Sequence, residues 1–388
     1  MRLLHTADLH IGQQLHGYDR REEHIAMLGA LTETAVEHKV DAIVVCGDVF
    51  DTARPSSQSA AIFAQAMARL RQALPEAAIV VTAGNHDSGA FIESHAPIYR
   101  ELGITLKGNL TPDNLDNHII SVVGKGVIAA LPYTYSALIP QGFARTVIAR
   151  ATEMAQGLPV VAMAHTTVLG SDPKGHQCPA MGRFDIGNID GINIVEFGDD
   201  YDYLALGHIH KPQYVGRGAR ARYSGAPLPV SFDERFEHSF SIVDIAARGA
   251  EPQITVVPFA SPRPALNIPA RGFGEWEEVK RAFSRLDPDF QGYVRLNVTV
   301  DGFLPPEARD EAERIASGKS CRFCLINARR RQVEGDRDEA ATVSVEEFRA
   351  LPVMEIARRY AEGIGARLDE ELLAEIINSL PESSRSTR

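Results

Sequence analysis

The sequence predicts a layered α/β fold for residues 1–260, followed by a smaller α+β unit and a helical tail. Three observations support this prediction. Short runs of branched aliphatic residues alternate with amphipathic stretches of helical period, each of these runs ends in a cluster of Gly, Asp, Asn or His, and closely spaced strands take over from residue 118. Alternation of strand and helix indicates βαβ units, in which helices pack on a sheet.

Buried strands are predicted from apolar runs that are only about five residues long. These runs are Leu3–Ala7, Ala42–Cys46, Ile79–Ala83 and Val160–Ala164. Between the first three, apolar residues recur every three or four positions, which predicts helices over Arg20–His38 and Ser57–Leu74. The first half of the chain therefore has the pattern of a sheet covered by helices.

After residue 118 the pattern changes to hairpins. They pair His118–Val123 with Val127–Leu131, and His238–Ile245 with Ile254–Phe259. Proline blocks continued strand pairing, so the proline-rich stretch Ser261–Pro264 predicts a linker. We expect this linker to separate a first domain of residues 1–260 from a smaller domain of residues 261–333.

The smaller domain alternates helices and strands. In chain order they are Trp276–Leu286, Tyr293–Val300, Pro305–Ala316 and Cys324–Ala328. Residues 334–388 form a third segment, with helices predicted over Val345–Ala361 and Asp369–Leu380. The second of these helices carries an apolar stripe at Leu372, Leu373, Ile376, Ile377 and Leu380. Core packing and docking on a partner protein explain such a stripe about equally well.

Composition places the chain among globular proteins. It has 388 residues, 44% apolar and 23% charged, which excludes a collagen, a coiled-coil rod and a mostly disordered chain. Four cysteines are too few for a disulfide framework and indicate a reducing compartment. The first residues turn polar too early for a signal peptide, and no apolar run approaches the ~20 residues of a membrane helix. We therefore expect a cytoplasmic protein with no membrane partner.

Five short clusters of chemically active residues follow the apolar runs. They are Asp8-Leu9-His10, Gly47-Asp48-Val49-Phe50-Asp51, Gly84-Asn85-His86-Asp87, Ala164-His165 and Gly207-His208-Ile209-His210. In open α/β sheets, ligands collect at the carboxyl ends of the strands, so all five clusters can converge on one crevice. Taken singly, each cluster is more simply a turn, a helix cap or a surface histidine. Five together need a compensating ion or partner.

The side chains in these clusters suit divalent metal ions. The candidate ligands are Asp8, His10, Asp48, Asn85, His165, His208 and His210. They combine carboxylate, amide and imidazole donors without cysteine, a set that suits Mn²⁺, Fe²⁺ or Zn²⁺ better than Mg²⁺. Seven ligands are more than one ion needs. We therefore expect two ions that lie about 3.5–4 Å apart and share a bridging carboxylate.

These motifs resemble those of the calcineurin-like metallophosphoesterase superfamily. Within it, the surrounding residues are similar to the exonuclease subunits of bacterial double-strand-break repair complexes. The matching stretches are Arg2–Gly12, Val40–Thr52, Leu204–His210 and Tyr223–Glu234. The resemblance is strong over residues 1–245, thin over 260–333, and returns faintly at Ser344–Phe348.

The resemblance implies a fold and a set of roles. The fold is an α-β-β-α metallophosphoesterase sandwich with a smaller α+β capping domain and a helical C-terminal tail. One ion would be held by Asp8, His10, Asp48 and His210, and the other by Asp48, Asn85, His165 and His208. His86 would act on the departing oxygen of the phosphodiester. Asp51 and Asp87 would orient loops and imidazoles.

The resemblance also implies an activity and partners. The activity is that of a metal-dependent DNA nuclease, a 3′–5′ exonuclease on double-stranded DNA with possible single-strand endonuclease action, in DNA repair and recombination. The substrates would be double-stranded ends or hairpins. Mn²⁺ is the metal we expect. The partner would be an ATPase subunit with a coiled coil, bound by the tail, in a heterotetramer that contains a homodimer of this chain.

Two alternatives remain open at this point. The first is another metallophosphoesterase, either a small-molecule phosphodiesterase or a protein phosphatase. Protein phosphatases usually carry Arg directly after the Gly-Asp-x-x-Asp motif, whereas this chain has Thr52 there. The second is a scaffold that tethers DNA ends and has a decayed metal site, although all of the candidate ligands are present.

Basic residues form two groups that could contact DNA phosphates. The first group is Arg217, Arg220 and Arg222, and the second is Lys319, Arg322, Arg329, Arg330 and Arg331. For the second group, a solvated surface is the slightly stronger interpretation. Cys321 and Cys324 form a C-x-x-C pair without further ligands nearby, so a packed pair is a better interpretation than a zinc site.

The net charge of −11 by itself argues against a nucleic-acid partner. However, residues 333–388 hold 13 acidic and 7 basic residues and so carry −6 of this total. Four further acids, Asp8, Asp48, Asp51 and Asp87, belong to the predicted metal site, where two dications would neutralise them. The rest of the chain is then close to neutral, and the acidic total does not exclude DNA.

Overall fold

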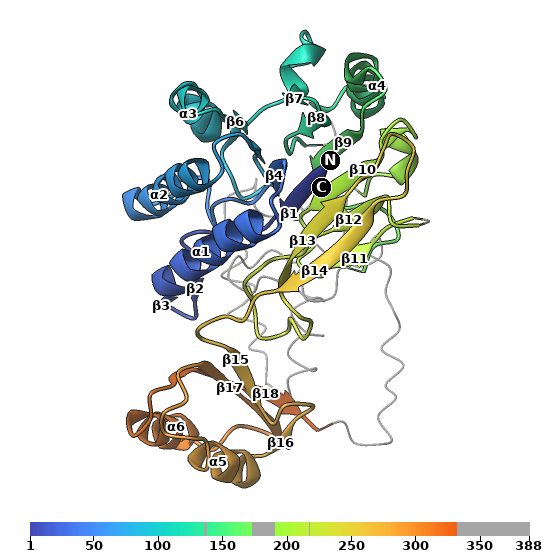
Figure 1. Ribbon diagram of the computed structural model, residues 1–388. Helices are drawn as coiled ribbons and strands as arrows, with labels where there is room; N and C mark the ends of the chain where they lie inside the picture. The colour runs from blue at the N-terminus through green and yellow to red at the C-terminus, as the bar shows by residue number, and fades with distance from the viewer. Residues whose placement is uncertain (136–137, 173–190, 217, 332–388) are drawn as a thin grey trace, which may run out of the picture. The chain divides into compact units, whose positions relative to one another are not determined.

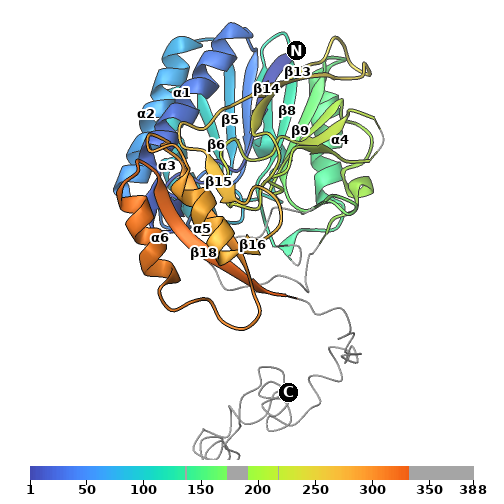
Figure 2. The ribbon, with the colours of Figure 1, turned by 90° about the horizontal axis from the view of Figure 1, so that it is seen from below.

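The computed structural model describes residues 1–135, 138–172, 191–216 and 218–331 (Figures 1 and 2). Residues Met1–Arg329 form one compact unit. The predicted tail helices, their apolar stripe and Arg217 lie outside the described residues. Among the helices that are described, none has the length and apolar character needed to span a membrane.

The first sheet has six strands in the order β14-β13-β1-β4-β5-β6. Their bounds are β1 (Arg2–Thr6), β4 (Ala42–Cys46), β5 (Ala78–Thr82), β6 (Ile104–Lys107), β13 (Ser239–Asp244) and β14 (Gln253–Pro258). Strands β1, β4, β5 and β6 are parallel, and β13 and β14 add to them antiparallel. Figure 2 shows helices along the outer face of this sheet, namely α1 (Arg21–Glu37), α2 (Ser57–Ala73) and α3 (Gly89–Glu101).

The second sheet also has six strands, in the order β11-β12-β10-β9-β8-β7. Their bounds are β7 (Ile119–Val122), β8 (Gly126–Leu131), β9 (Val160–His165), β10 (Tyr203–Gly207), β11 (Gln213–Tyr214) and β12 (Ala221–Tyr223). Helix α4 (Phe143–Ala155) packs on its outer face through Val147, Ile148 and Ala151. The short elements beside the sheets are β2 (Gln14–Leu15), β3 (Tyr18–Asp19), η1 (Leu115–His118) and η4 (Ile194–Phe197).

Alternating side chains hold the four layers together. Along β4, Ile43 and Val45 point to the core beneath the helices, while Val44 points to a second core between the sheets. Met163 and Tyr203 of the second sheet fill that inner core. The central strands are buried on both faces, which explains their short, wholly apolar sequences. The predicted α-β-β-α sandwich is confirmed.

A separate four-stranded sheet follows the sandwich in the sequence. Its elements are β15 (Ala265–Ile268), β16 (Gly274–Glu275), α5 (Trp276–Ser284), β17 (Tyr293–Val300), α6 (Ala308–Ser317) and β18 (Arg322–Arg330). Strand β17 pairs with all three other strands, and its apolar residues pack with Trp276 and Phe283 of α5 in a core of their own. We call these strands the small sheet. The domain boundaries at residues 260 and 333 stay a prediction.

Sequence patterns missed several helices and strands. Helix α3 was not predicted because it contains Pro97, which lacks the amide hydrogen of a helix interior. Helix α4 and strand β6 were also missed, and β18 is longer than predicted. On α1, the apolar residues Ile25 and Val36 are exposed, because the helix turns them away from the sheet.

Candidate metal centre

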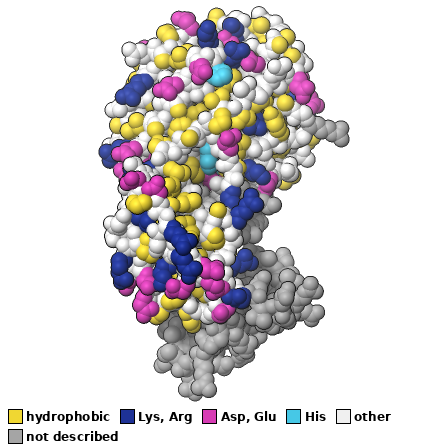
Figure 3. Space-filling model, turned by 60° about the horizontal axis from the view of Figure 1, so that its bottom comes forward, with side chains coloured by type: hydrophobic (Ala, Val, Ile, Leu, Met, Phe, Trp, Pro, Cys, Tyr) yellow, Lys and Arg dark blue, Asp and Glu magenta, His cyan; other side chains and the backbone are white. Residues whose placement is uncertain are grey.

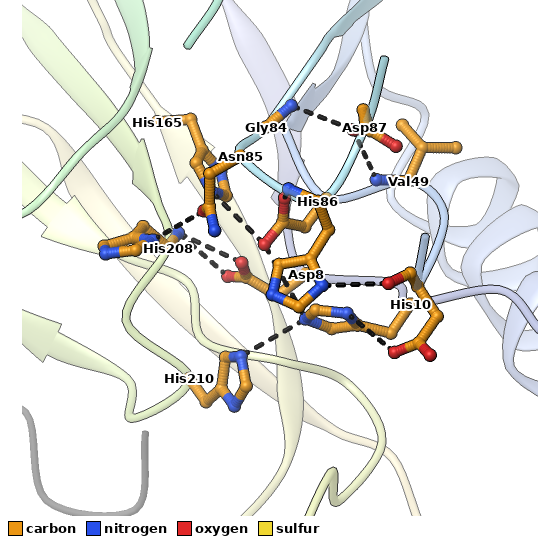
Figure 4. Close-up of polar contacts among 12 residues, drawn as sticks. Asp8, His10, Val49, Gly84, Asn85, His86, Asp87, His165, His208 and His210 are labelled. Atoms are coloured by element: carbon orange, nitrogen blue, oxygen red, sulfur yellow. Dashed lines mark hydrogen bonds and ion pairs between the residues drawn. The ribbon is translucent and has the colours of Figure 1, made fainter. Parts of the chain in front are cut away.

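The five predicted clusters converge at the carboxyl ends of β1, β4, β5, β9 and β10 (Figure 4). The two sheets face each other, so loops from both sheets meet at this edge. Left-handed backbone conformations are unusual for residues other than glycine. Among the described residues, seven non-glycine residues adopt positive φ, and four of these are Asp8, His10, Asp48 and His208. Backbone strain is therefore concentrated where the clusters meet.

Asp8, His10 and His210 form the first group of side chains. Their ligand atoms all lie within 4.8 Å of one another. The Nε2 atoms of His10 and His210 are 3.2 Å apart, and the Asp8 carboxylate accepts hydrogen bonds of 3.0 and 3.2 Å from the His208 amide. Two facing imidazole nitrogens beside a carboxylate are a donor set for a divalent cation.

Asp48, His165 and His208 form the second group, with ligand atoms again within 4.8 Å of one another. Asn85 adds an amide oxygen to this group. Its Oδ1 lies 2.9 Å from His165 Nε2 and 2.9 Å from His208 Nδ1. All seven candidate ligands therefore lie together in two adjoining groups, as the sequence predicted that they would cluster. Their role as ligands stays a proposal.

Asp48 of the second group also faces His10 of the first. The surroundings of its carboxylate show whether the site suits a cation. Its Oδ1 accepts a 2.8 Å hydrogen bond from the His86 amide. Its Oδ2 is buried without a hydrogen-bond partner among the described residues, 3.8 Å from His10 Nε2 and 3.3 Å from His165 Nε2. A buried carboxylate oxygen without a donor is costly unless a cation is bound to it. The donor set and this oxygen fit a bridging metal ligand.

Hydrogen bonds fix the orientation of three imidazoles. His165 donates from Nδ1 to the Cys46 carbonyl over 2.8 Å, which turns its Nε2 toward Asp48. His86 donates from Nδ1 to the Asp51 carbonyl over 2.9 Å, and its ring lies edge-on to that of His10. A partner on one ring nitrogen selects the tautomer in which the other nitrogen is free to bind.

Glu234 orients the third imidazole, and sequence reasoning assigned it no role. Its Oε1 lies 2.8 Å from His210 Nδ1, and its carboxylate is buried. In many metal sites, a carboxylate binds one ring nitrogen of a histidine whose other ring nitrogen binds the metal. The available signal was the stretch Tyr223–Glu234, which the sequence shares with the resembled family but which contains none of the recognised ligand motifs.

Asp87 and Asp51 lie just outside the two groups. The Asp87 carboxylate accepts hydrogen bonds from the amides of Val49 (3.0 Å), Phe50 (2.9 Å) and Gly84 (2.8 Å), so it joins two loops of the site. Burial and the nearby Asp48 carboxylate raise the pKa of Asp87 to about 7. Asp51 Oδ1 is 3.5 Å from His10 Nδ1. Both residues contact the loops or imidazoles that they were expected to orient.

Opposite charges stabilise one another at the centre of the site. Burial opposes ionisation of Asp48, but His165 and His10 hold the pKa of Asp48 well below its ordinary value. Burial raises the pKa of Asp8. Burial, followed by the neighbouring His165, lowers the pKa of His208 to about 3. Without a metal ion, the protein thus places a proton on His165 to balance Asp48.

Mn²⁺ affinity is expected to increase from pH 7 to pH 9. Burial alone would lower the pKa of His165, but the Asp48 and Asp8 carboxylates raise it to about 9. The imidazole is therefore protonated below pH 9, and a metal ion must displace that proton. One proton per ion corresponds to a gain in affinity of up to about tenfold per pH unit. Calorimetric titration in two buffers measures the released proton, and a constant affinity over this range would contradict the prediction.

The described members of the first basic group, Arg220 and Arg222, contact other parts of the protein. Arg222 is buried, donates to Ser241 Oγ over 3.3 Å and stacks on the Tyr214 ring at 4.7 Å. Its guanidinium is held inside the protein, which favours a structural role over the predicted contact with phosphates. Arg220 donates to the Asp199 carbonyl over 3.0 Å and stacks on Tyr201.

Two residues of the second basic group, Lys319 and Arg322, are engaged in the protein itself. Lys319 Nζ donates to the carbonyls of Ser284 and Leu286 at the end of α5. Arg322 donates to the Asp19 carbonyl and to the Tyr293 hydroxyl. Arg329, Arg330 and Arg331 are exposed at the end of β18. Acidic and basic side chains are interspersed on the face in Figure 3, where histidine also reaches the surface. Lys319 and Arg322 fit the structural interpretation, and DNA contact by the three exposed arginines stays a prediction.

The C-x-x-C pair packs as two separate residues. Cys321 contacts the core of the small sheet, while Cys324 packs with a different cluster that contains Leu15, Phe232 and Tyr293. Both cysteines are free thiols. In the part of the chain that the structure describes, neither joins a group of metal-ligating side chains. The packed interpretation is the better one.

Comparison with known proteins identifies the class. The model of the calcineurin-like phosphoesterase family matches residues 1–212, and the chain belongs to this family. It is therefore a hydrolase of phosphoric esters, and membership implies bound divalent metal ions. The resemblance predicted from the motifs is confirmed.

Three curated relatives carry the same name, the D subunit of the nuclease SbcCD. The protein of Rhodobacter capsulatus is 35% identical over 314 residues, or 74% of this chain and 76% of the relative. That of Escherichia coli K12 is 33% identical over 60% of this chain and 62% of its own length. That of Bacillus subtilis is 31% identical over 77% of this chain and 79% of its own. A solved structure, TT1561 of Thermus thermophilus, aligns over 66% of this chain and 98% of its own with a TM-score of 0.38 and 12% identity.

Proposed function

We propose that this chain is the nuclease subunit of a two-component DNA repair complex and hydrolyses phosphodiesters with two divalent metal ions. The observation that carries this proposal is the position of Asp48, whose buried Oδ2 forms no hydrogen bond among the described residues and lies near His10 of the first ligand group and His165 of the second. The curated relatives are named as nuclease subunits, which supports a nucleic acid as the substrate, and DNA is the nucleic acid that we propose. Mn²⁺ is the metal that we propose.

The chain's residues would divide the work as follows. Asp8, His10, Asp48 and His210 would hold one ion, and Asp48, Asn85, His165 and His208 the other. Bound ions supply positive charge and Lewis acidity at the phosphodiester. The protein's contribution is to fix the donors on rigid strand ends, so that no reorganisation is needed during the reaction.

His86 is the residue that we propose moves a proton. Its Nδ1 is committed to the Asp51 carbonyl, so the ring is held in one orientation beside His10. Its Nε2 would then hold the proton that passes to the departing 3′-oxygen. Because a ring nitrogen of His86 also lies within 4.8 Å of ligand atoms of His10 and Asp48, the test must separate proton transfer from metal binding.

His86→Ala is expected to lower cleavage of linear duplex DNA by about 10²–10⁴-fold, the usual contribution of a general acid, while Mn²⁺ affinity stays within about twofold of wild type. Cleavage is measured on end-labelled DNA with Mn²⁺, and affinity by the electron paramagnetic resonance signal of free Mn²⁺. His95→Ala, which removes an imidazole of α3 outside the cluster, is the matched control. Loss of Mn²⁺ binding in His86→Ala would make His86 a ligand instead.

The same assay tests the proposed substrate. Wild type is expected to degrade linear duplex DNA from its ends with 3′–5′ polarity, and to open hairpins through endonuclease action on single strands. Turnover of a nucleotide monoester without any cleavage of DNA would instead indicate a small-molecule phosphodiesterase. Binding of DNA ends without turnover of either substrate would indicate a tethering scaffold.

We also propose an assembly. A partner ATPase with a coiled coil would bind residues 334–388, and two copies of this chain would pair in a heterotetramer. The relatives' name, which designates one subunit of a complex, supports a second component. Copurification of the ATPase with the full chain, compared with a chain ending at residue 333, tests this part of the proposal, and equal copurification would contradict it.

A further inference from the structure

A loop of residues 229–234, here named the clamp loop, joins the metal centre to the small sheet. It lies between β12 and β13 in the sequence. Its last two residues contact different parts of the protein. Glu234 contacts His210 in the metal centre, whereas Asp233 forms an ion pair with Arg295 of β17. Adjacent residues of one short loop thus connect two sites that are 85 positions apart in the sequence.

On the side of the metal centre, the clamp loop sets the position of an imidazole. Glu234 Oε1 lies 2.8 Å from His210 Nδ1, and Glu234 Oε2 accepts a 2.9 Å hydrogen bond from the Val230 amide. His210 in turn faces His10, with 3.2 Å between their Nε2 atoms. Because the carboxylate is bound to the loop's own backbone, the ring of His210 follows the loop.

On the side of the small sheet, Arg295 holds the clamp loop with a two-pronged contact. Its Nη2 and Nη1 atoms donate to the two oxygens of Asp233 over 2.7 and 3.1 Å. The guanidinium also lies 5.3 Å from the centre of the Phe232 ring. Asn267 of β15, the register partner of Arg295, donates to the Phe232 carbonyl over 2.9 Å. Arg295 is buried, and Asp233 supplies the opposite charge beside its guanidinium.

The clamp loop has a third attachment near the first ligand motif. Gln13 donates to the Val230 carbonyl over 2.8 Å, and Arg20 donates to the Pro229 carbonyl over 2.7 Å. The backbone amide of Gln13 donates to the His10 carbonyl over 2.9 Å. The loop is therefore held between the ligand loops and the small sheet, and a change at either side can be transmitted by a rigid segment.

We propose that Arg295 is a positioning residue for the metal centre: through Asp233 and the clamp loop it holds Glu234 against His210. The affinity of the site for a divalent cation then depends on the contact between the small sheet and the clamp loop. This inference rests on the metal centre of the proposed function, but not on the identity of the substrate. It assigns a role to the end of the matching stretch Tyr223–Glu234, which contains no candidate ligand.

The test measures metal binding and needs no DNA. Full-length Arg295→Met, Glu234→Gln and the double variant are titrated with Mn²⁺, and free Mn²⁺ is followed by electron paramagnetic resonance. Loss of a carboxylate partner of a ligand imidazole usually weakens metal binding about 10–100-fold. We expect Glu234→Gln to fall in this range and Arg295→Met to weaken Mn²⁺ binding about tenfold.

Arg263→Met is the matched control. Arg263 precedes β15 and forms a 3.4 Å ion pair with Glu22 of α1, so it also links this region to the sandwich, but it does not contact the clamp loop. Its Mn²⁺ affinity is expected to equal that of wild type. If Arg295 acts through Glu234, adding Arg295→Met to Glu234→Gln has little further effect, because the coupled residues are not additive.

Arg295→Lys and Asp233→Asn test the same ion pair and are used if Arg295→Met does not fold. Lysine keeps the charge but loses the two-pronged geometry, so an intermediate Mn²⁺ affinity is expected. Full Mn²⁺ affinity in folded Arg295→Met, or fully additive effects in the double variant, would overturn the inference. If the wild type binds Mn²⁺ but does not cleave DNA, only the proposed function is contradicted. If the wild type binds no Mn²⁺, the proposed function and this inference are both contradicted.

Discussion

Asp48→Asn is expected to lower DNA cleavage by roughly 10³-fold or more. The amide keeps the shape of the carboxylate but removes its charge. Asp48 belongs to the second group and also faces His10 of the first, because its buried Oδ2 is 3.3 Å from His165 Nε2 and 3.8 Å from His10 Nε2. Loss of this charge therefore weakens both halves of the site, whereas loss of any other candidate ligand weakens one.

A binding measurement accompanies the cleavage assay. Mn²⁺ at 100 times its dissociation constant should stabilise wild type by about 2.7 kcal/mol and raise its unfolding midpoint. The same concentration should leave the midpoint of Asp48→Asn unchanged. Asp116→Asn, at an exposed aspartate paired with Arg150, is the matched control and should behave as wild type. Asp48→Asn that retains a tenth of wild-type cleavage would contradict a bridging role.

Gly207→Ala is expected to cost about 3 kcal/mol of unfolding free energy, at the upper end of overpacking effects. A Cβ atom at this position would overlap the Cys46 carbonyl oxygen and would lie 2.8 Å from Ala7 Cβ and 2.9 Å from His165 Nδ1. The Cys46 carbonyl is also the acceptor for His165 Nδ1. The substitution therefore pushes β10 away from β4 and disturbs a candidate ligand at the same time.

Gly29→Ala provides the opposite result in the same experiment. Gly29 lies within α1, and a Cβ atom there would meet nothing within 4 Å. Alanine should stabilise the helix by about 0.5–1 kcal/mol, because glycine loses more backbone entropy on folding. Urea unfolding measures both variants. A loss below about 1 kcal/mol in Gly207→Ala would show that the strands can separate without cost.

The sandwich and the clustering of the candidate ligands were predictable from the sequence for a specific reason. Strands buried on both faces must be continuous apolar runs, and parallel strands bring their carboxyl ends to one edge. The polar residues that follow each run are then neighbours in space wherever they lie in the sequence. Helix α3 was not predictable in this way, because its Pro97 breaks the local signal while tertiary packing still supports the helix.

The roles of individual charged residues were less predictable, because burial and partners are set by distant parts of the chain. Arg222 has the sequence context of a surface arginine, yet β12 places it against Tyr214 and Ser241 inside the protein. Lys319 belongs to a basic run, yet it caps the carbonyls at the end of α5. The sequence shows which residues are charged, but it does not show which of them are exposed to solvent.

By itself, the sequence determined the family, the layered fold and the residues that gather at the strand ends, because all of these follow from local apolar patterns and short motifs. Only the tertiary structure showed that Glu234 and Arg295 also take part in orienting those residues. Glu234 meets His210 from 24 positions away, and Arg295 meets Asp233 from 62 positions away. Such contacts depend on how whole sheets pack and have no local periodicity, so no pattern in the sequence reports them.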